Sequence, residues 1–251
     1  MVFVQGGSYK PVFCDDKINI VNLYVSKFQV TQEEWQEIMK YNPSHFKGEK
    51  LPVECITWRE TLEFCNKLSE KHKLQPAYKI EDNKLARIIY KNNEEVYPDL
   101  ADFSKVEGYR LPTEAEWEWF ARGGLKAIPN TSLDIKYSGS KEIDEVAWYI
   151  KNSDLKTHEV GLKKPNELGL YDCTGNVWEW CYDTVSDSEP NKNIPKGKTF
   201  LYNIKIEKNR RIRGSSWCSS DWIYKVRKYS SDKKNDCGFR IVKSINIDNV
   251  E

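Results

Sequence analysis

Long apolar runs and an excess of charge of either sign are both absent from this sequence. No apolar stretch approaches the roughly 18 residues that a membrane-spanning helix needs. Lys and Arg together number 39 and Asp and Glu 38, which leaves a formal net charge of +1. A protein that binds nucleic acid through bulk charge needs a concentrated basic face. We therefore expect neither a membrane span nor a nucleic-acid partner.

Paired metal-ligand motifs are missing as well. The cysteines include no C-x-x-C pair and show no zinc pattern. We therefore expect most of them to be reduced and to pack as small buried hydrophobic residues. The three histidines lie among polar neighbours, so surface or turn roles are favoured over catalysis. The first residues lack a basic segment followed by an apolar one, so a cytoplasmic location is the expectation. The cysteines are Cys14, Cys55, Cys65, Cys173, Cys181, Cys218 and Cys237, and the histidines are His45, His72 and His158.

The chain is rich in aromatic residues, with 9 Trp, 14 Tyr and 9 Phe among its 251 residues. Such residues suit strands and irregular packed loops better than helical bundles. A chain of this length can bury a sizeable core without disulfides or metals. No charge block, flexible linker or fixed-period repeat divides it, so residues 1–251 are predicted to form a single domain.

Three helix starts carry the same signature, a Thr followed three residues later by a Glu. In this capping box the Thr oxygen accepts from the third amide and the Glu accepts from the Thr amide. The pairs are Thr31 with Glu34, Thr57 with Glu60, and Thr113 with Glu116. At helical spacing, the predicted buried faces are Trp35, Ile38 and Met39 in the first helix, Leu62, Cys65 and Leu68 in the second, and Trp117, Phe120 and Ala121 in the third.

Short β-rich runs separate these helices at residues 18–25, 86–90 and 239–242. Turns are predicted at residues 92–93, 138–139 and 196–197, and the glycine pair at 123–124 is a natural helix stop. Together, these helices, strands and turns predict an α+β fold with a few amphipathic helices and much irregular structure.

The segment from Gly169 to Trp180 has the most specific chemistry. Its two carboxylates, Asp172 and Glu179, flank a loop with Gly175 and Asn176, so carboxylate and carbonyl oxygens can converge where the backbone turns. Hard oxygen ligands of mixed origin are those that Ca²⁺ takes. The alternative is that Asp172 caps a turn and Glu179 is a solvated strand residue.

Five motifs together resemble the formylglycine-generating enzyme family, also called the sulfatase-modifying-factor domain, and they occur in the family's order. They are Val30–Trp35, Tyr109–Glu118, Gly169–Trp180, Arg213–Trp217 and Gly238–Arg240. The resemblance covers about residues 6–242 and leaves a polar tail at 243–251. It implies a single compact domain with a C-type-lectin-like core and little regular secondary structure. It also implies a calcium site with the side chains of Asp172 and Glu179 and the carbonyls of Gly175 and Val177 as ligands.

Catalytic members of this family bind copper(I) through two cysteines and use O₂ to oxidise a cysteine of a client sulfatase to formylglycine. Soft thiolates are the ligands that copper(I) prefers. Counted from the Gly-Gly-Ser-aromatic motif, the two cysteine positions fall here on Ser219 and Tyr224. Cys218 is a weak candidate one position away, but it would have no partner thiolate, and a packed thiol is its expected role. The copper chemistry is therefore expected to be absent.

The same region offers a candidate ligand face, because exposed aromatics with adaptable polar neighbours are typical of binding surfaces. In non-catalytic relatives this region forms the ligand face. The alternative is that side chains alternate between two faces of an extended segment, which would put half of these aromatic residues in the core. The candidate residues are Trp217, Ser219, Asp221, Trp222, Tyr224, Arg227 and Tyr229. The favoured hypothesis is a non-catalytic, calcium-stabilised module that binds an unidentified protein or small ligand. The alternative is a divergent formylglycine-generating oxidase that uses copper and O₂.

Overall fold

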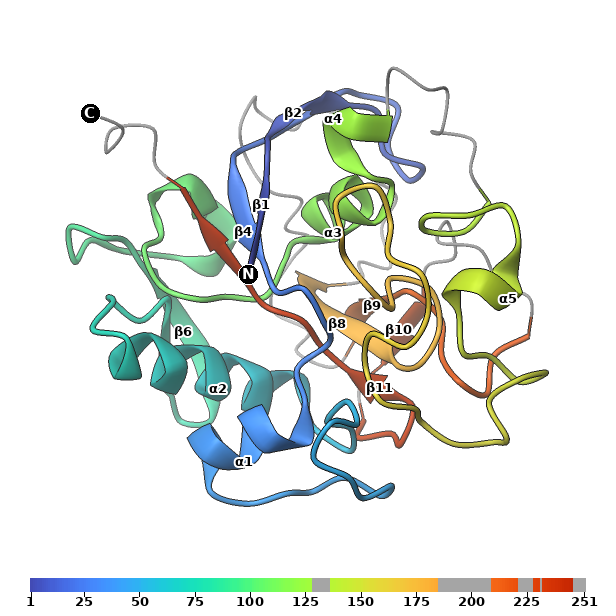
Figure 1. Cartoon of the computed structure of the whole chain (residues 1–251). Coiled ribbons are helices and arrows are strands. Elements are labelled where there is room, and N and C mark those ends of the chain that lie inside the picture. Colours follow the sequence, from blue (N-terminus) through green and yellow to red (C-terminus); the bar gives the residue numbers. More distant parts are fainter. Residues whose placement is uncertain (128–135, 185–208, 221–227, 231, 246–251) are drawn as a thin grey trace.

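The computed structural model describes residues 1–127, 136–184, 209–220, 228–230 and 232–245. Short strands and helices in these ranges are joined by long irregular connections (Figure 1). The predicted α+β class with little regular secondary structure is confirmed. No helix within the described ranges is both long and apolar enough to cross a bilayer.

Three helices begin at the predicted capping boxes. Helix α1 spans Gln32–Met39, α2 spans Trp58–Lys71 and α3 spans Glu114–Ala121, and both hydrogen bonds of each box are present. Helices α1 and α2 lie side by side at one end of the molecule (Figure 1). The other helical pieces are single turns: α4 (Gly124–Ala127), α5 (Ile143–Val146), and the 3-10 turns η1 (Pro98–Leu100) and η2 (Phe103–Lys105).

The strands in the described ranges form four small sheets. One sheet joins the two ends of the chain in the order β1 (Val2–Val4), β4 (Leu23–Val25), β12 (Val242–Ser244). Two others are the pair β2 (Gly7–Tyr9) with β3 (Ile18–Ile20), and the sheet of β5 (Tyr78–Glu81), β6 (Lys84–Ile89) and β7 (Glu95–Val96). The fourth has the order β10 (Lys228–Ser230), β9 (Arg210–Arg213), β8 (Trp178–Thr184), β11 (Cys237–Gly238), with β11 parallel to β8.

Two of the predicted strand runs are corrected by the structure. Residues 18–25 form two strands, β3 and β4, that pair with different partners. Residues 239–242 are not a strand except at Val242. The carbonyls of Phe239 and Ile241 accept hydrogen bonds from Val30 and Ser26, in a connection that is itself not a strand. Residues 86–89 lie in β6 as predicted, and the turn predicted at 196–197 lies outside the described residues.

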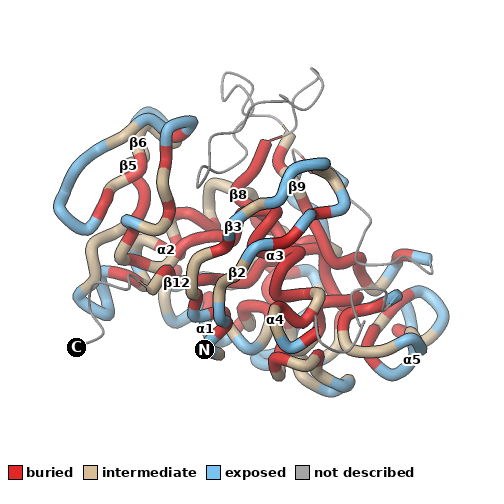
Figure 2. The backbone as a smooth tube through the Cα atoms, turned by 90° about the horizontal axis from the view of Figure 1, so that it is seen from above, coloured by how far each residue is buried: buried red, intermediate tan, exposed pale blue. Residues whose placement is uncertain are grey.

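The core surrounds α3 and β8, whose residues are buried along their whole length (Figure 2). The predicted inner faces of the first two helices are largely confirmed, although Ile38 and Leu68 are only partly buried. Helix α3 also buries the carboxylates of Glu114, Glu116 and Glu118, which the sequence pattern did not indicate. Arginines from other parts of the chain neutralise these acids, so the core contains ion pairs as well as aromatic rings.

Candidate functional site

The carboxylate of Glu179 on β8 is the point at which three of the five sequence motifs meet. Its carboxylate is fully buried and accepts two hydrogen bonds from Arg240, at 2.6 and 2.7 Å. The indole Nε1 of Trp117 on α3 donates to Glu179 Oε2 at 2.7 Å, and Gln29 Nε2 donates to Oε1 at 3.0 Å. The interpretation of Glu179 as a solvated strand residue is therefore wrong.

Burial on its own would lower the pKa of the Arg240 guanidinium, but the nearby Cys173 and Glu179 raise it. Arg240 therefore stays charged in a fully buried position. Removing one partner of such a buried ion pair destabilises the folded state, because an uncompensated charge then remains in the interior. The pair holds the segment before β12 against β8 and the loop that precedes β8.

Three of the four predicted calcium ligands, the carbonyls of Gly175 and Val177 and the carboxylate of Glu179, lie around the side-chain nitrogen of Gln29. Gln29 Nε2 lies 2.9 Å from the carbonyl oxygen of Val177, 3.1 Å from that of Asp172 and 3.5 Å from that of Gly175. With Glu179 Oε1, four oxygens surround one amide group, which has only two hydrogens to donate. The opposite orientation of the amide would place an oxygen against these four oxygens, so the nitrogen must face them in the absence of a cation.

Asp172 takes part differently from the expectation, since its carbonyl oxygen faces the Gln29 nitrogen. Its carboxylate Oδ2 accepts a hydrogen bond from the amide of Gly161 at 2.8 Å, and Oδ1 has no partner among the described residues. Burial raises the pKa of this carboxyl to about 6, opposed by the Gly161 hydrogen bond and by Arg240. The Oε1 of Gln29 is also buried, and no described residue forms a hydrogen bond with it.

This donor set fits a calcium ion. Three carbonyls and one carboxylate are hard oxygens of mixed origin. Two further buried oxygens of the same residues, Asp172 Oδ1 and Gln29 Oε1, have no hydrogen-bond donor in the part of the chain that the structure describes. Among the described residues there is no cluster of three or more His, Cys, Asp or Glu side chains that could hold a metal. Backbone carbonyls supply three of the four oxygens here, whereas the prediction gave two carbonyls and two carboxylates.

Three residues of this loop, Asp172, Gly175 and Asn176, have a left-handed backbone conformation with positive φ, which turns the chain sharply. A Cβ on Gly175 would lie 2.4 Å from the carbonyl oxygen of Trp148, so only glycine fits there. The Asn176 side chain accepts a hydrogen bond from the amide of His158 and donates one to its carbonyl, which ties the loop to the segment around His158. The carbonyls are thus aimed by backbone constraints that are present without any ion.

The first of the family's cysteine positions is a buried hydroxyl. Ser219 Oγ lies 3.0 Å from Ser216 Oγ and accepts from the Ser216 amide at 3.2 Å. Ser216 Oγ also donates to Asp236 Oδ2 at 3.1 Å. The side chain of Ser219 therefore serves the local turn, and it does not contribute to an exposed ligand face. The second position, Tyr224, lies outside the described residues.

Cys218 is exposed, so the expectation of a packed thiol is wrong. Its sulfur lies 3.3 Å from Asp236 Oδ2 and 3.4 Å from Ser216 Oγ. Although the residue is exposed, partial loss of water around the sulfur raises the pKa of the thiol; the Ser216 hydrogen bond opposes this shift, and the Asp236 carboxylate adds to it. The neutral thiol is therefore favoured over the thiolate that a metal ligand or nucleophile requires.

Only part of the predicted ligand face can be placed. Trp217 is half-buried, its ring meets Phe46 edge-on at 5.5 Å between centroids, and its Nε1 donates to the carbonyl of Asn235. The backbone of Tyr229 pairs with Arg211 in the β9–β10 ladder. The predicted residues Asp221, Trp222, Tyr224 and Arg227 lie outside the described residues.

Sequence reasoning missed the residues that surround the predicted sites. Gln29 directly precedes the Val30–Trp35 motif, but a single buried amide has no periodic signal. Asp236 stands just before the last motif and likewise looks like an ordinary loop acid. Arg240 lies within that motif and could have been found, because a buried arginine next to apolar residues demands a carboxylate partner.

With this geometry in place, three comparisons identify the family. The chain matches the sulfatase-modifying factor enzyme 1-like domain over residues 1–245. The chaperone protein LppX of Paenibacillus barcinonensis is 38% identical over 227 residues, which cover 81% of this chain and 79% of that protein. The formylglycine-generating enzyme of Mus musculus is 33% identical over 154 residues, which cover 56% of this chain and 40% of the enzyme. The solved structure of Treponema denticola variable protein 1 has a TM-score of 0.77 and 33% identity, covering 98% of this chain and 95% of that one.

The chain therefore belongs to the sulfatase-modifying factor enzyme 1-like domain family, and the predicted family is confirmed. It forms a single compact domain of the formylglycine-generating-enzyme type. Proteins similar to it include enzymes and a protein named as a chaperone, so membership by itself does not assign an activity. The match to the mouse enzyme spans less than half of that enzyme's length.

Proposed function

We propose that this chain is a non-catalytic member of its family, stabilised by calcium, that binds a protein partner through the surface around Trp217. The observation that carries the proposal is the state of the first cysteine position. Ser219 is a hydroxyl already bonded to Ser216, and it offers no soft ligand for copper(I). The likeness to a chaperone along most of both chains favours a protein over a small molecule as the partner.

Cys218 alone does not replace the pair. Copper(I) held by two thiolates needs two sulfurs, and the raised pKa of Cys218 disfavours even one thiolate at neutral pH. Asp236, which lies 3.3 Å from this sulfur, would repel the negative charge of a thiolate. The alternative function, a divergent oxidase, requires a different set of residues.

The two functions are separated by a direct assay of peptide oxidation. A cysteine-containing sulfatase-type peptide is incubated with the protein, copper(I), O₂ and a thiol reductant, and the product is analysed by mass spectrometry. A catalytic formylglycine-generating enzyme serves as the positive control. We expect no aldehyde from this chain. Aldehyde formation that is lost in Cys218→Ser would instead establish the oxidase function.

Partner binding is tested with a defined client. Citrate synthase is heated with increasing amounts of the protein, and its aggregation is followed by light scattering. We expect the wild-type protein to slow aggregation and Trp222→Ala, which changes one of the residues predicted from the sequence for the ligand face, to lose the effect. Tyr97→Ala is the matched control, because Tyr97 is an exposed aromatic residue on a different part of the chain. Aggregation that is unaffected by an excess of wild-type protein contradicts the proposed chaperone-like binding.

Calcium would be held by the carbonyls of Asp172, Gly175 and Val177 and by Glu179 Oε1. Bound there, the ion would neutralise the converging oxygens and tie the loop to β8. It must first displace the amide nitrogen of Gln29, which now satisfies part of this cluster. The side chain of Gln29 can rotate to present its Oε1 instead, an oxygen that has no hydrogen-bond partner within the described ranges.

The calcium proposal is tested by thermal unfolding in calcium, in EGTA and in magnesium. Ligand at about 100 times its Kd stabilises a native state by about 2.7 kcal/mol. For a chain of this size that corresponds to a rise in Tm on the order of 5–10 °C. We expect calcium but not magnesium to raise the midpoint, because the carbonyl-rich, irregular cluster suits the larger ion. Equal midpoints in calcium and EGTA contradict the proposal.

A further inference from the structure

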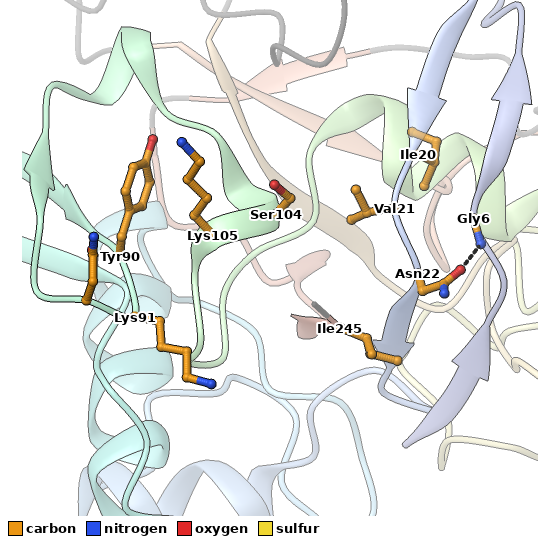
Figure 3. A pocket seen from close by; sticks show the side chains of 10 residues that line it. Gly6, Ile20, Val21, Asn22, Tyr90, Lys91, Ser104, Lys105 and Ile245 are labelled. Carbon is orange, nitrogen blue, oxygen red and sulfur yellow. Dashed lines mark hydrogen bonds between the residues drawn. The ribbon is translucent and has the colours of Figure 1, made fainter. Parts of the chain in front are cut away.

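A cavity of about 960 Å³ lies away from both sites described above, between the N-terminal strands and the segment around η2 (Figure 3). Its volume is at the upper end of the range of pockets that hold small molecules. Figure 3 shows Tyr90, Lys91 and Lys105 on one side, with Val21 and Ile245 across from them. One wall combines residues from the two ends of the described chain, the other comes from residues 90–105, and the two differ in chemistry.

One wall is apolar and rigid. Ile20, Val21 and Ile245 line it, and the backbone amide of Ile245 donates to the carbonyl of Asn22 at 3.0 Å. The Asn22 side chain accepts from the Gly6 amide at 2.8 Å. A Cβ on Gly6 would lie 2.2 Å from the carbonyl oxygen of Ile20, so glycine is required for this close approach. The apolar wall is therefore built before any ligand arrives.

The other wall is basic. The amide of Lys91 donates to the carbonyl of Lys105 at 2.9 Å, which holds the two lysines next to each other. The hydroxyl of the buried Tyr90 accepts from the Asp102 amide, and its ring lies 5.5 Å from the ammonium of Lys105. In the part of the chain that the structure describes, neither ammonium forms an ion pair with a carboxylate. Both lysines thus line the cavity, and their ammonium groups point in different directions in Figure 3.

We propose that this cavity binds a small amphipathic anion, with a carboxylate between Lys91 and Lys105 and an apolar body against Val21 and Ile245. The lysine stems are flexible, so both ammonium groups can turn toward one head group. The apolar wall has no charged side chain that could pair with a second charge on the ligand. A ligand charged at one end only is therefore favoured. Removing the apolar body from water supplies affinity, and the two ammonium groups select the anion.

Decanoate is the probe, measured by isothermal titration calorimetry below the concentration at which it forms micelles. We expect saturable one-to-one binding to the wild-type protein. Decanol tests the head group and butyrate the apolar body, and both are expected to bind at least tenfold more weakly. The variant Lys91→Gln/Lys105→Gln is expected to lose at least tenfold in affinity for decanoate, and Ile245→Asn to weaken binding by removing part of the apolar wall.

The control variant is Lys151→Gln/Lys156→Gln, which removes the same charge from exposed lysines in the connection that follows α5. It is expected to bind decanoate as the wild type does, and the thermal midpoint of each variant shows that it is folded. The proposal is overturned if millimolar decanoate gives neither binding heat nor a shift in the wild-type midpoint. It is also overturned if decanol binds as well as decanoate, or if the two lysine pairs behave alike.

Discussion

Replacing Gln29 by Glu gives the sharpest test of the oxygen cluster. The change removes the NH₂ group that faces four oxygens and puts a carboxylate beside Glu179. At least two hydrogen bonds to buried acceptors are lost, and a buried charge without a partner is added. We expect the Gln29→Glu protein in EGTA to lose about 3–5 kcal/mol of unfolding free energy, a fall in Tm on the order of 10 °C.

Calcium should reverse this loss, because the cation supplies the positive charge that the new carboxylate lacks as a partner. The calcium-induced rise in Tm is therefore expected to be larger in Gln29→Glu than in the wild type, as measured by calorimetry in calcium and in EGTA. Gln29→Leu is the matched control, since it removes the donor but adds no ligand, and calcium should rescue it less. Equal losses for Gln29→Glu in both buffers would refute the idea that amide and cation compete for one position.

Three further predictions concern other buried or reactive groups. Arg240→Met is expected to cost about 3–5 kcal/mol in denaturant unfolding, because it strands the Glu179 carboxylate; a loss under 1 kcal/mol would show that this carboxylate is readily protonated or solvated. Burial, with Glu114 nearby, raises the pKa of Asp183 to about 7 from its ordinary 3.8. Because the folded state retains this proton longer than the unfolded state, stability should fall as pH rises from about 4 to 7, by at most about 4 kcal/mol, and Asp183→Asn should flatten that slope. Cys218 should react with iodoacetamide more slowly than glutathione does at pH 7, since its thiol pKa is raised; faster alkylation, localised by mass spectrometry, would contradict this.

Predictions that depended on neighbours along the chain were the most successful. A capping box involves residues three apart, so its hydrogen bonds follow from local sequence, and all three boxes are present. The convergence of the 172–179 oxygens was also foreseeable, because a short loop with glycine can turn its own carbonyls inward. The strand predicted at residues 239–242 failed because its hydrogen-bond partners are residues 26–30, which local propensity does not specify.

The sequence by itself determined the family, the helix starts and the loop that gathers oxygens around one point. Only the tertiary structure decided what stands at that point, because Gln29 lies 143 residues from Asp172 and reaches it through the fold. The same holds for Arg240, which meets Glu179 across 61 residues, and for Asp236, which lies beside Ser216 and Cys218. Contacts of this kind carry no periodic signal in the sequence, and they are fixed by burial, which requires each interior charge and donor to find a partner.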